Sequence, residues 1–478
     1  MRLKTKQFII KKAVLLFILT LSVLMSLILS SCSSSGDGQI DSESEISFSS
    51  LEVIPPADSA PQLGDIPELP SEFKILRESK VNDIFFSNAD APDIMSKTVY
   101  ERNSLLLRQY GITLSEESVS DIVTHATNAM LSEENDHDML VLSAPSSASL
   151  ITSGALCDLE SLAGFDSSAK GYYTEVISDL SLGGRSFLAA GDATPSLLRS
   201  TSAVMVNRDL LSKVTGSDSD LFEIAKNGKF TYDLMLKYAA GLASLNASEV
   251  ALPQTSFIRA DAEDALALFF GGDGHFFDRD EVTDEPFAAD FGGANSDIFA
   301  SVMSLYGISV NGEDEGDEEI SSASASPIFT VVSIAELEAL ADATSPYAAL
   351  PMPKMQGTQV SYISNVDMTK AAFTALPSNG DSEASVRVMN LIYSLSEGIP
   401  KLIKDKCEPE GSDYGTFELI EESISCDLLT FFGFGDLPSM MTSFVNEQSS
   451  LKVFELRAAE RSTAAVTALS IVISKLNQ

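Results

Sequence analysis

The chain has 478 residues, and its 69 Asp and Glu outnumber its 31 Lys and Arg, which gives a formal net charge of −38 at pH 7. Such a surface repels nucleic-acid phosphates and anionic lipid, so we expect no nucleic-acid partner. A hydrophobic content of 44% excludes disorder of the whole chain. Even without its first 31 residues the chain is too long for one simple core, and this length predicts two lobes or domains.

Residues 1–31 have the order of an export signal. Five Lys and Arg precede an apolar run from Ala13 to Leu29, and two serines then lead to Cys32. This order predicts a bacterial lipoprotein signal peptide, acyl chains on Cys32 after cleavage, and a product anchored by lipid on the extracellular face of the plasma membrane. A transmembrane helix is the alternative, but the run is at the lower limit for spanning a bilayer and leaves Cys32 without a role.

Residues 32–70 are predicted to form a flexible tether that lifts the folded part from the membrane. They are rich in Ser, Gly, Asp, Glu and Pro, and a stretch of this composition cannot bury a core. We expect ordered structure to begin near Phe73.

Beyond the tether, short apolar runs alternate with a helical pattern. The runs that predict strands lie at Phe73–Leu76, Ile112–Leu114 and Met139–Leu142. Between the last two, apolar residues from Val119 to Met130 follow the i, i+3, i+4, i+7 spacing of an amphipathic helix. This alternation predicts βαβ units, a largely parallel sheet covered on both faces, and an α/β fold class.

Three more helices are predicted in the second half of the chain. Thr231 can cap one helix, Asp261 can start another that ends at a pair of glycines, and Leu451–Leu476 is helical by its period. A polyacidic insert at residues 311–319 interrupts the pattern, and we interpret it as a solvated surface loop. It does not fit a calcium loop, because Ser322 stands where a bidentate Glu is required.

Three cysteines follow the anchor position. Cys407 and Cys426 lie in a polar, acidic stretch, which is compatible with an external disulfide or with a pair of free buried thiols. Cys157 is interpreted as a small buried apolar residue. No cysteine spacing is that of a zinc site and no redox CxxC motif is present, so no metal is expected.

No catalytic motif stands out in the sequence. The three histidines, His125, His137 and His275, have no partner at metal-ligand spacing, and there is no Gly-x-Ser-x-Gly elbow or phosphate-binding loop. A glycosidase-type pair of carboxylates cannot be picked out among so many acidic residues. We therefore predict a protein that is not an enzyme and needs no cofactor.

Several short motifs carry a resemblance to a known family. They are Tyr100–Asn103, Gly154–Leu159, Val204–Leu211, Gly228–Leu234, and Leu350–Lys354 with Gln359 and Tyr362. In content and order these stretches resemble extracellular solute-binding proteins of family 1, the lipoprotein receptors of ABC importers, many of them sugar-specific. The similarity extends from about Phe73 to Leu429, nearly the whole chain beyond the tether.

The resemblance implies a two-lobe periplasmic-binding-protein-like fold whose hinge-connected α/β lobes close on a ligand. The implied lobes are residues 71–195 with 350–400, and residues 196–349 with 401–478. On this model the chain crosses from the first lobe to the second near Ala190–Ser202 and returns near Tyr347–Pro353. The final helices are expected to pack largely on the second lobe.

The resemblance also implies where a ligand is held, although the chain has no tryptophan to stack on a sugar. The implied ligand-binding residues are Arg102, Tyr172, Tyr173, Asp192, Tyr362 and Asn365. Tyr172-Tyr173 stand where relatives often have a Trp pair, and Asp192 at the hinge can accept hydrogen bonds from ligand hydroxyls. As structural alternatives, the two tyrosines pack at a lobe edge, Asp192 caps a turn, and Arg102 forms an ion pair.

The function that follows is a lipid-anchored extracellular substrate-binding protein of an ABC importer, for which the expected ligand is a carbohydrate. Its expected partners are a small solute, the permease subunits, and the membrane through the lipid anchor. Two alternatives are a surface glycan hydrolase with an unrecognised pair of carboxylates, and a degenerate receptor that serves as an adhesin or sensor.

Overall fold

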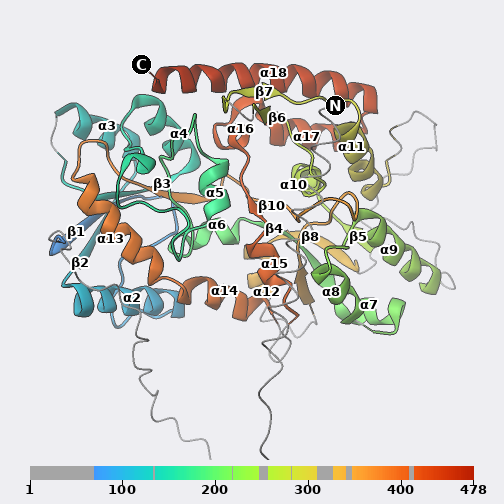
Figure 1. The fold of residues 1–478 in the computed structure, drawn as a ribbon. Coiled ribbons are helices and arrows are strands. Elements are labelled where there is room, and N and C mark those ends of the chain that lie inside the picture. Colours follow the sequence, from blue (N-terminus) through green and yellow to red (C-terminus); the bar gives the residue numbers. More distant parts are fainter. Residues whose placement is uncertain are drawn as a thin grey trace, which may run out of the picture. The chain divides into compact units, whose positions relative to one another are not determined.

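The computed structural model (Figure 1) describes residues 69–132, 135–217, 219–246, 257–280, 283–308, 310, 327–340, 347–408 and 414–477. The predicted signal peptide, Cys32, nearly all of the tether and the polyacidic insert lie outside these ranges. Within the described part of the chain, no helix is both long enough and apolar enough to cross a membrane.

One four-stranded sheet has the strand order β11-β3-β1-β2. Its members are β1 (Glu72–Glu78), β2 (Thr113–Val119), β3 (Met139–Ser143) and β11 (Ala372–Ala375). β1 pairs in parallel with β2 and β3, whereas β11 is antiparallel to β3. All five residues of β3 are buried. The strands predicted from apolar runs are confirmed, and β3 has the continuous apolar sequence expected of a strand covered on both faces, whereas β1 and β2 also carry exposed polar residues.

Helices lie around this sheet (Figure 1). They are α2 (Ile94–Tyr110), α3 (Ile122–Ser132), α4 (Ala144–Ser153), η1 (Leu159–Ser161), α5 (Thr174–Asp179) and α13 (Ser382–Ser394). The predicted amphipathic helix is confirmed as α3, but its first predicted residue was wrong. Val119 ends β2 and pairs with Glu78. The helix begins only after Asp121, whose carboxylate accepts a hydrogen bond from the Thr124 amide at 3.0 Å.

A second four-stranded sheet has the order β5-β8-β4-β9. Its strands are β4 (Ser202–Asn207), β5 (Ile258–Arg259), β8 (Phe329–Ser333) and β9 (Tyr347–Leu350). The expectation of a largely parallel sheet is wrong here, because β4 is antiparallel to both β8 and β9 and only β5 and β8 are parallel. A buried apolar run indicates that a strand is covered, but it carries no information about strand direction.

The remaining elements complete the second half. They are α6 (Pro195–Arg199), α7 (Arg208–Thr215), α8 (Ser219–Lys226), α9 (Tyr232–Asn246), η3 (Ala262–Asp264), α10 (Ala265–Gly271), β6 (Phe277–Arg279), β7 (Pro286–Ala288), α11 (Ala294–Leu305), α12 (Ile334–Leu340), β10 (Ser364–Asn365), α14 (Gly398–Cys407), α15 (Phe417–Glu421), β12 (Ile424–Ser425), α16 (Leu428–Phe431), η4 (Phe434–Asp436), α17 (Leu437–Asn446) and α18 (Leu451–Leu476). The cap at Thr231 is confirmed, since its hydroxyl accepts the Leu234 amide at 3.4 Å. Asp261 starts the 3₁₀ turn η3, and α10 follows that turn.

The two sheets belong to one compact unit, Asp65–Gln478, and several helices contact elements from the surroundings of both. The chain leaves the first sheet's surroundings through α6 and enters the second sheet at Ser202. The long helix α18 contacts α11 and also α4, so it is not confined to the second sheet (Figure 1). The residue ranges given above for the two lobes stay a prediction.

The cysteine question has an answer within the described residues. Cys407 and Cys426 are both free and buried, and Cys157 is free and partly exposed. Of the two arrangements left open by the sequence, the structure therefore has the free thiols rather than the disulfide.

Candidate functional site

Two of the residues implied by the resemblance, Tyr173 and Asp192, lie on neighbouring backbone segments. Tyr172 and Gly191 form an isolated antiparallel bridge. The Tyr173 amide donates to the Ala190 carbonyl at 3.0 Å, and the Asp192 amide donates to the Gly171 carbonyl at 2.8 Å. Two hydrogen bonds thus fix the backbone of Tyr173 against that of Asp192.

Gly191 makes this approach possible. Its φ is +154°, and a Cβ placed on it would lie 2.0 Å from the Gly171 carbonyl oxygen and 2.9 Å from the Tyr172 Cα. Real Cβ atoms do not approach backbone this closely, so only glycine fits at this point of the bridge.

A third polar group, Glu421, comes from the far end of the chain. It ends α15, which contacts β9 of the second sheet. Just before α15, the Thr416 hydroxyl donates to the Ala349 carbonyl of β9 at 2.8 Å. The negative charges of Asp192 and Glu421 both help to raise the pKa of Tyr173, and that of Asp192 helps to raise the pKa of Glu421, so the three side chains, called the cluster below, lie within electrostatic range of one another.

The electrostatics of this cluster disfavour charge. Burial raises the pKa of Asp192 to about 6, and the negative charge of Glu397 adds to the shift. Burial also raises the pKa of Glu421 to about 7, with the charge of Asp192 as the next cause. The pKa of Tyr173 is raised well above its ordinary value, first by burial and then by these two carboxylates.

Among the residues that the structure describes, the side chains of the cluster find no hydrogen-bond partner. The side chains of Tyr173, Asp192 and Glu421 make no hydrogen bond to any residue that the structure describes. Both nearby cations are engaged elsewhere, since Lys170 pairs with Glu397 and Lys404 with Glu418. Two carboxylates and a phenol that are partly buried and unpaired suit a solute that brings its own hydrogen-bond donors.

Tyr172 packs beneath this cluster. Its ring lies 4.4 Å from the ring of Tyr393 and meets Phe165 edge to face at 5.7 Å. Its hydroxyl donates to Asn390 Oδ1 at 2.8 Å, and only 8% of the residue is exposed. In this structure Tyr172 supports the backbone on which Tyr173 sits, and its role as a ligand contact stays a prediction.

Arg102 is buried, with 2% of the residue exposed. Its guanidinium donates to the Phe85 carbonyl at 2.8 Å and to Ser396 Oγ at 3.2 Å. Arg102 forms no ion pair with a carboxylate in the described ranges, so the structural alternative of an ion pair is wrong there. Burial lowers the pKa of Arg102 to about 10. The fold therefore uses this cation to satisfy backbone and hydroxyl oxygens.

The polar groups of Tyr362 and Asn365 bond to backbone, although Asn365 lies on β10, which pairs with the segment that follows Glu421. The Tyr362 hydroxyl donates to the Ala225 carbonyl at 2.8 Å and accepts the Phe230 amide at 3.1 Å. Asn365, on β10, donates to the Val366 carbonyl at 3.2 Å. Both residues are 7% exposed. Their polar groups are used locally, and their predicted contact with a ligand stays untested.

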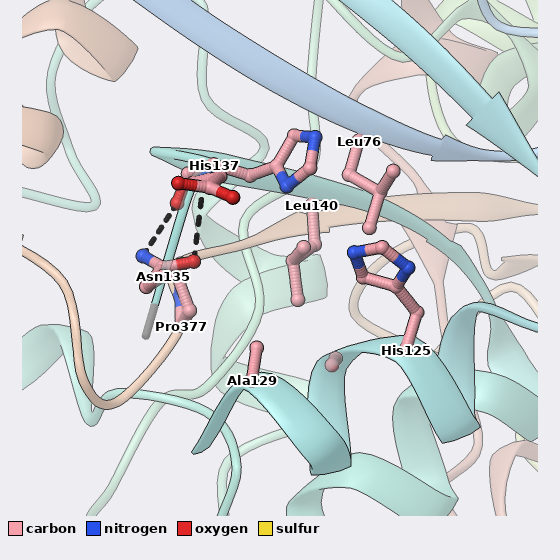
Figure 2. Close-up of a pocket in the computed structure, with 9 residues that line it drawn as sticks. Leu76, His125, Ala129, Asn135, His137, Leu140 and Pro377 are labelled. Carbon is pink, nitrogen blue, oxygen red and sulfur yellow. Dashed lines mark hydrogen bonds between the residues drawn. The ribbon is translucent and has the colours of Figure 1, made fainter. Parts of the chain in front are cut away.

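A separate cavity of about 40 Å³ lies beside the first sheet (Figure 2). Its lining includes His125 of α3 and His137, whose rings meet edge to face at 5.6 Å. Asn135 also lines the cavity, and its side-chain amide donates to the His137 carbonyl at 2.6 Å. A space of this size holds a few waters but not a sugar. No cluster of three or more metal-ligating side chains occurs in the described part of the chain.

The sequence did not point to Glu421 or to the meeting of His125 with His137. Glu421 stands among acidic residues that have the pattern of an exposed helix, so no local signal marks it. The histidine contact joins helix α3 to a residue two positions before β3, and neither segment contains a pattern that predicts this contact.

No protein-family model matches this sequence. No curated protein matches it either. Solved structures do resemble the fold. A cyclic α-maltosyl-1,6-maltose binding protein from Arthrobacter globiformis has a TM-score of 0.52 and 13% identity, with 84% of this chain and 99% of that chain covered. At this identity the likeness establishes the fold alone, an α/β fold of the periplasmic-binding-protein class.

Two further structures cover the same shares of each chain. The ABC substrate-binding protein Lmo0181 from Listeria monocytogenes, in complex with cycloalternan, has a TM-score of 0.48 and 11% identity over 84% of this chain and 99% of that chain. Maltose-bound MalE3 from T. maritima has a TM-score of 0.45 and 10% identity over 84% of this chain and 99% of that chain.

Proposed function

We propose that the protein is a lipid-anchored extracellular substrate-binding protein of an ABC importer and that it binds a carbohydrate at Tyr173, Asp192 and Glu421. The observation that carries the proposal is the cluster itself, in which three polar side chains from distant segments have no partner among the described residues. The export order around Cys32 and the motif resemblance support the anchor and the importer.

A carbohydrate fits the chemistry of the cluster. Sugar hydroxyls donate to carboxylates, and a tyrosine presents both a hydroxyl and an apolar ring face. The Arthrobacter globiformis protein, whose fold is of the same class, is a cyclic α-maltosyl-1,6-maltose binding protein. In the proposed mechanism the solute bridges Asp192 and Glu421, and the contacts that it makes to both segments stabilise the closed arrangement.

The proposal predicts that a carbohydrate raises the melting temperature of the wild-type protein in a panel of oligosaccharides, amino acids and peptides. A ligand at one hundred times its Kd stabilises the native state by about 2.7 kcal/mol. Glu421→Gln is expected to lose most of this shift, because an NH₂ donor replaces one of the two carboxyl oxygens that can accept from sugar hydroxyls. Scanning calorimetry or fluorescence-monitored melting measures the effect.

Glu422→Gln is the matched control, since Glu422 is the exposed neighbour of Glu421. It should retain the full shift. A panel in which nothing stabilises the wild type contradicts the proposed function, and a full shift in Glu421→Gln contradicts the assigned site.

A second candidate function, a surface glycan hydrolase, is favoured by one observation. Asp192 and Glu421 are two carboxylates in one cluster with pKa values raised to about 6 and about 7, and glycosidases use such pairs as acid and base. Release of reducing sugar from polysaccharides by the wild type, lost in Asp192→Asn with folding intact, would establish the hydrolase. Binding without release supports the receptor.

A further inference from the structure

The C-terminal end of α5 is joined to the second half of the chain by polar contacts. α5 itself belongs to the surroundings of the first sheet, since Ile177 packs in the core cluster that contains Phe73 and Met139. At its end, however, the helix contacts β12, which pairs with β10 near the second sheet. The end of α5 is therefore a junction between the two halves.

Arg279 of β6 makes the first set of contacts at this junction. Its Nη2 donates to the carbonyls of Asp179 and Ser181, both at 3.0 Å. The carboxylate of Asp284 holds Nη1 at 3.2 Å and so orients the guanidinium. The terminal carbonyls of a helix have no partner within the helix, and one guanidinium from the other half satisfies the last carbonyl of α5, that of Asp179, together with the Ser181 carbonyl just beyond it.

The Asp179 carboxylate makes the second set. Its Oδ2 accepts the Cys426 amide at 2.8 Å and the Ser425 hydroxyl at 3.0 Å. Burial of this carboxyl raises its pKa. Separation of α5 from β12 would leave the amide and the carboxylate without these partners, so the contact resists opening.

The same two segments carry the proposed ligand groups. Tyr173 immediately precedes the first residue of α5, and Glu421 lies just before β12. α5 has only six residues, so a ligand group stands at one end of it and the junction at the other. A solute that binds both Tyr173 and Glu421 would therefore add contacts between two segments that the junction already joins.

We propose that Arg279 and Asp179 form a latch that holds the two halves together without solute, and that a solute bridging the segments of Tyr173 and Glu421 reinforces it. This inference rests on the proposed function. The latch adds its own hydrogen bonds to those of the solute, so the closed state is stabilised at a place that the solute does not touch.

The test uses the full chain without any solute. Arg279→Met retains the side-chain stem and removes the donors, and Asp179→Asn retains the shape and removes the charge. Hydrogen exchange of residues 174–182 and 424–427 is expected to become at least about tenfold faster in both variants, the loss expected from charged hydrogen bonds. Small-angle X-ray scattering should show a larger radius of gyration.

Arg457→Met is the control, because Arg457 forms an exposed ion pair with Glu447 at 2.8 Å. Its exchange and radius of gyration should match those of the wild type. Unchanged exchange in Arg279→Met and Asp179→Asn overturns the latch, and so does faster exchange confined to residues 174–182 without a change in radius. Because the exchange and scattering measurements use no solute, they remain valid if the thermal panel finds no ligand. That failure would contradict the proposed function alone.

Discussion

Gly191→Ala is expected to lower the free energy of unfolding by more than about 3 kcal/mol and to abolish solute binding. The new Cβ would meet the Gly171 carbonyl oxygen at 2.0 Å, and the atom in its way is backbone rather than a flexible side chain. The bridge between Tyr172 and Gly191 must therefore separate. Because that bridge holds Tyr173 against Asp192, the stability loss and the binding loss have one cause.

Urea unfolding measures the first effect, and the thermal panel measures the second. Gly357→Ala is the matched control, since Gly357 is exposed and its Cβ would meet nothing within 4 Å. Its stability should stay within about 0.5 kcal/mol of the wild type. A Gly191→Ala protein that unfolds like the wild type would show that the close backbone approach is not a feature of the molecule in solution.

The stability of the protein is expected to decrease as the pH rises from about 5 to about 8. The groups responsible are the carboxyls whose pKa burial raises to about 6 or 7: Asp83, Asp192, Asp264, Glu421 and Asp427. Above the ordinary pKa of such a group, the folded state binds more protons than the unfolded state. The free energy of unfolding therefore falls with rising pH until the folded pKa is passed.

Carboxyls with lowered pKa values, such as Glu78 and Glu338, act in the opposite direction. Their contribution is present above the ordinary pKa and is lost only in more acidic solution, so it does not offset the decrease above pH 5. We expect a decrease of at least about 2 kcal/mol, roughly the effect of a single carboxyl shifted by two pH units.

Urea unfolding at a series of pH values checks this expectation. The double variant Asp192→Asn, Glu421→Gln should show a shallower dependence than the wild type, because two of the titrating groups are removed. A free energy of unfolding that stays constant or rises between pH 5 and pH 8 would mean that burial does not raise the pKa values of these carboxyls.

The strands of the first sheet were predictable because their physical cause is local. Met139–Leu142 is apolar in sequence and buried on both faces in the structure, and Phe73, Ile75 and Leu76 of β1 are buried while Lys74 between them is exposed. The boundary at Val119 was not predictable from spacing, because an apolar residue at the end of a strand fits the period of the following helix. Strand direction in the second sheet depends on where the chain enters it, and apolar runs contain no such information.

The candidate site was predictable only in part. The resemblance named Tyr173 and Asp192, and the structure places them side by side through the bridge at Gly191. It could not name Glu421, because the contact is tertiary and the surrounding sequence is that of an exposed acidic helix. The buried positions of Arg102 and Tyr362 likewise depend on carbonyl groups from other segments, Phe85 and Ala225, which no spacing in the sequence reveals.

The most direct test of the central claim is a crystal structure of the protein with the carbohydrate that most raises its melting temperature. We predict sugar hydroxyls within hydrogen-bonding distance of the Asp192 and Glu421 carboxylates, with the Tyr173 side chain in contact with the same sugar. A sugar bound elsewhere, with Asp192 and Glu421 free of it, would contradict the account.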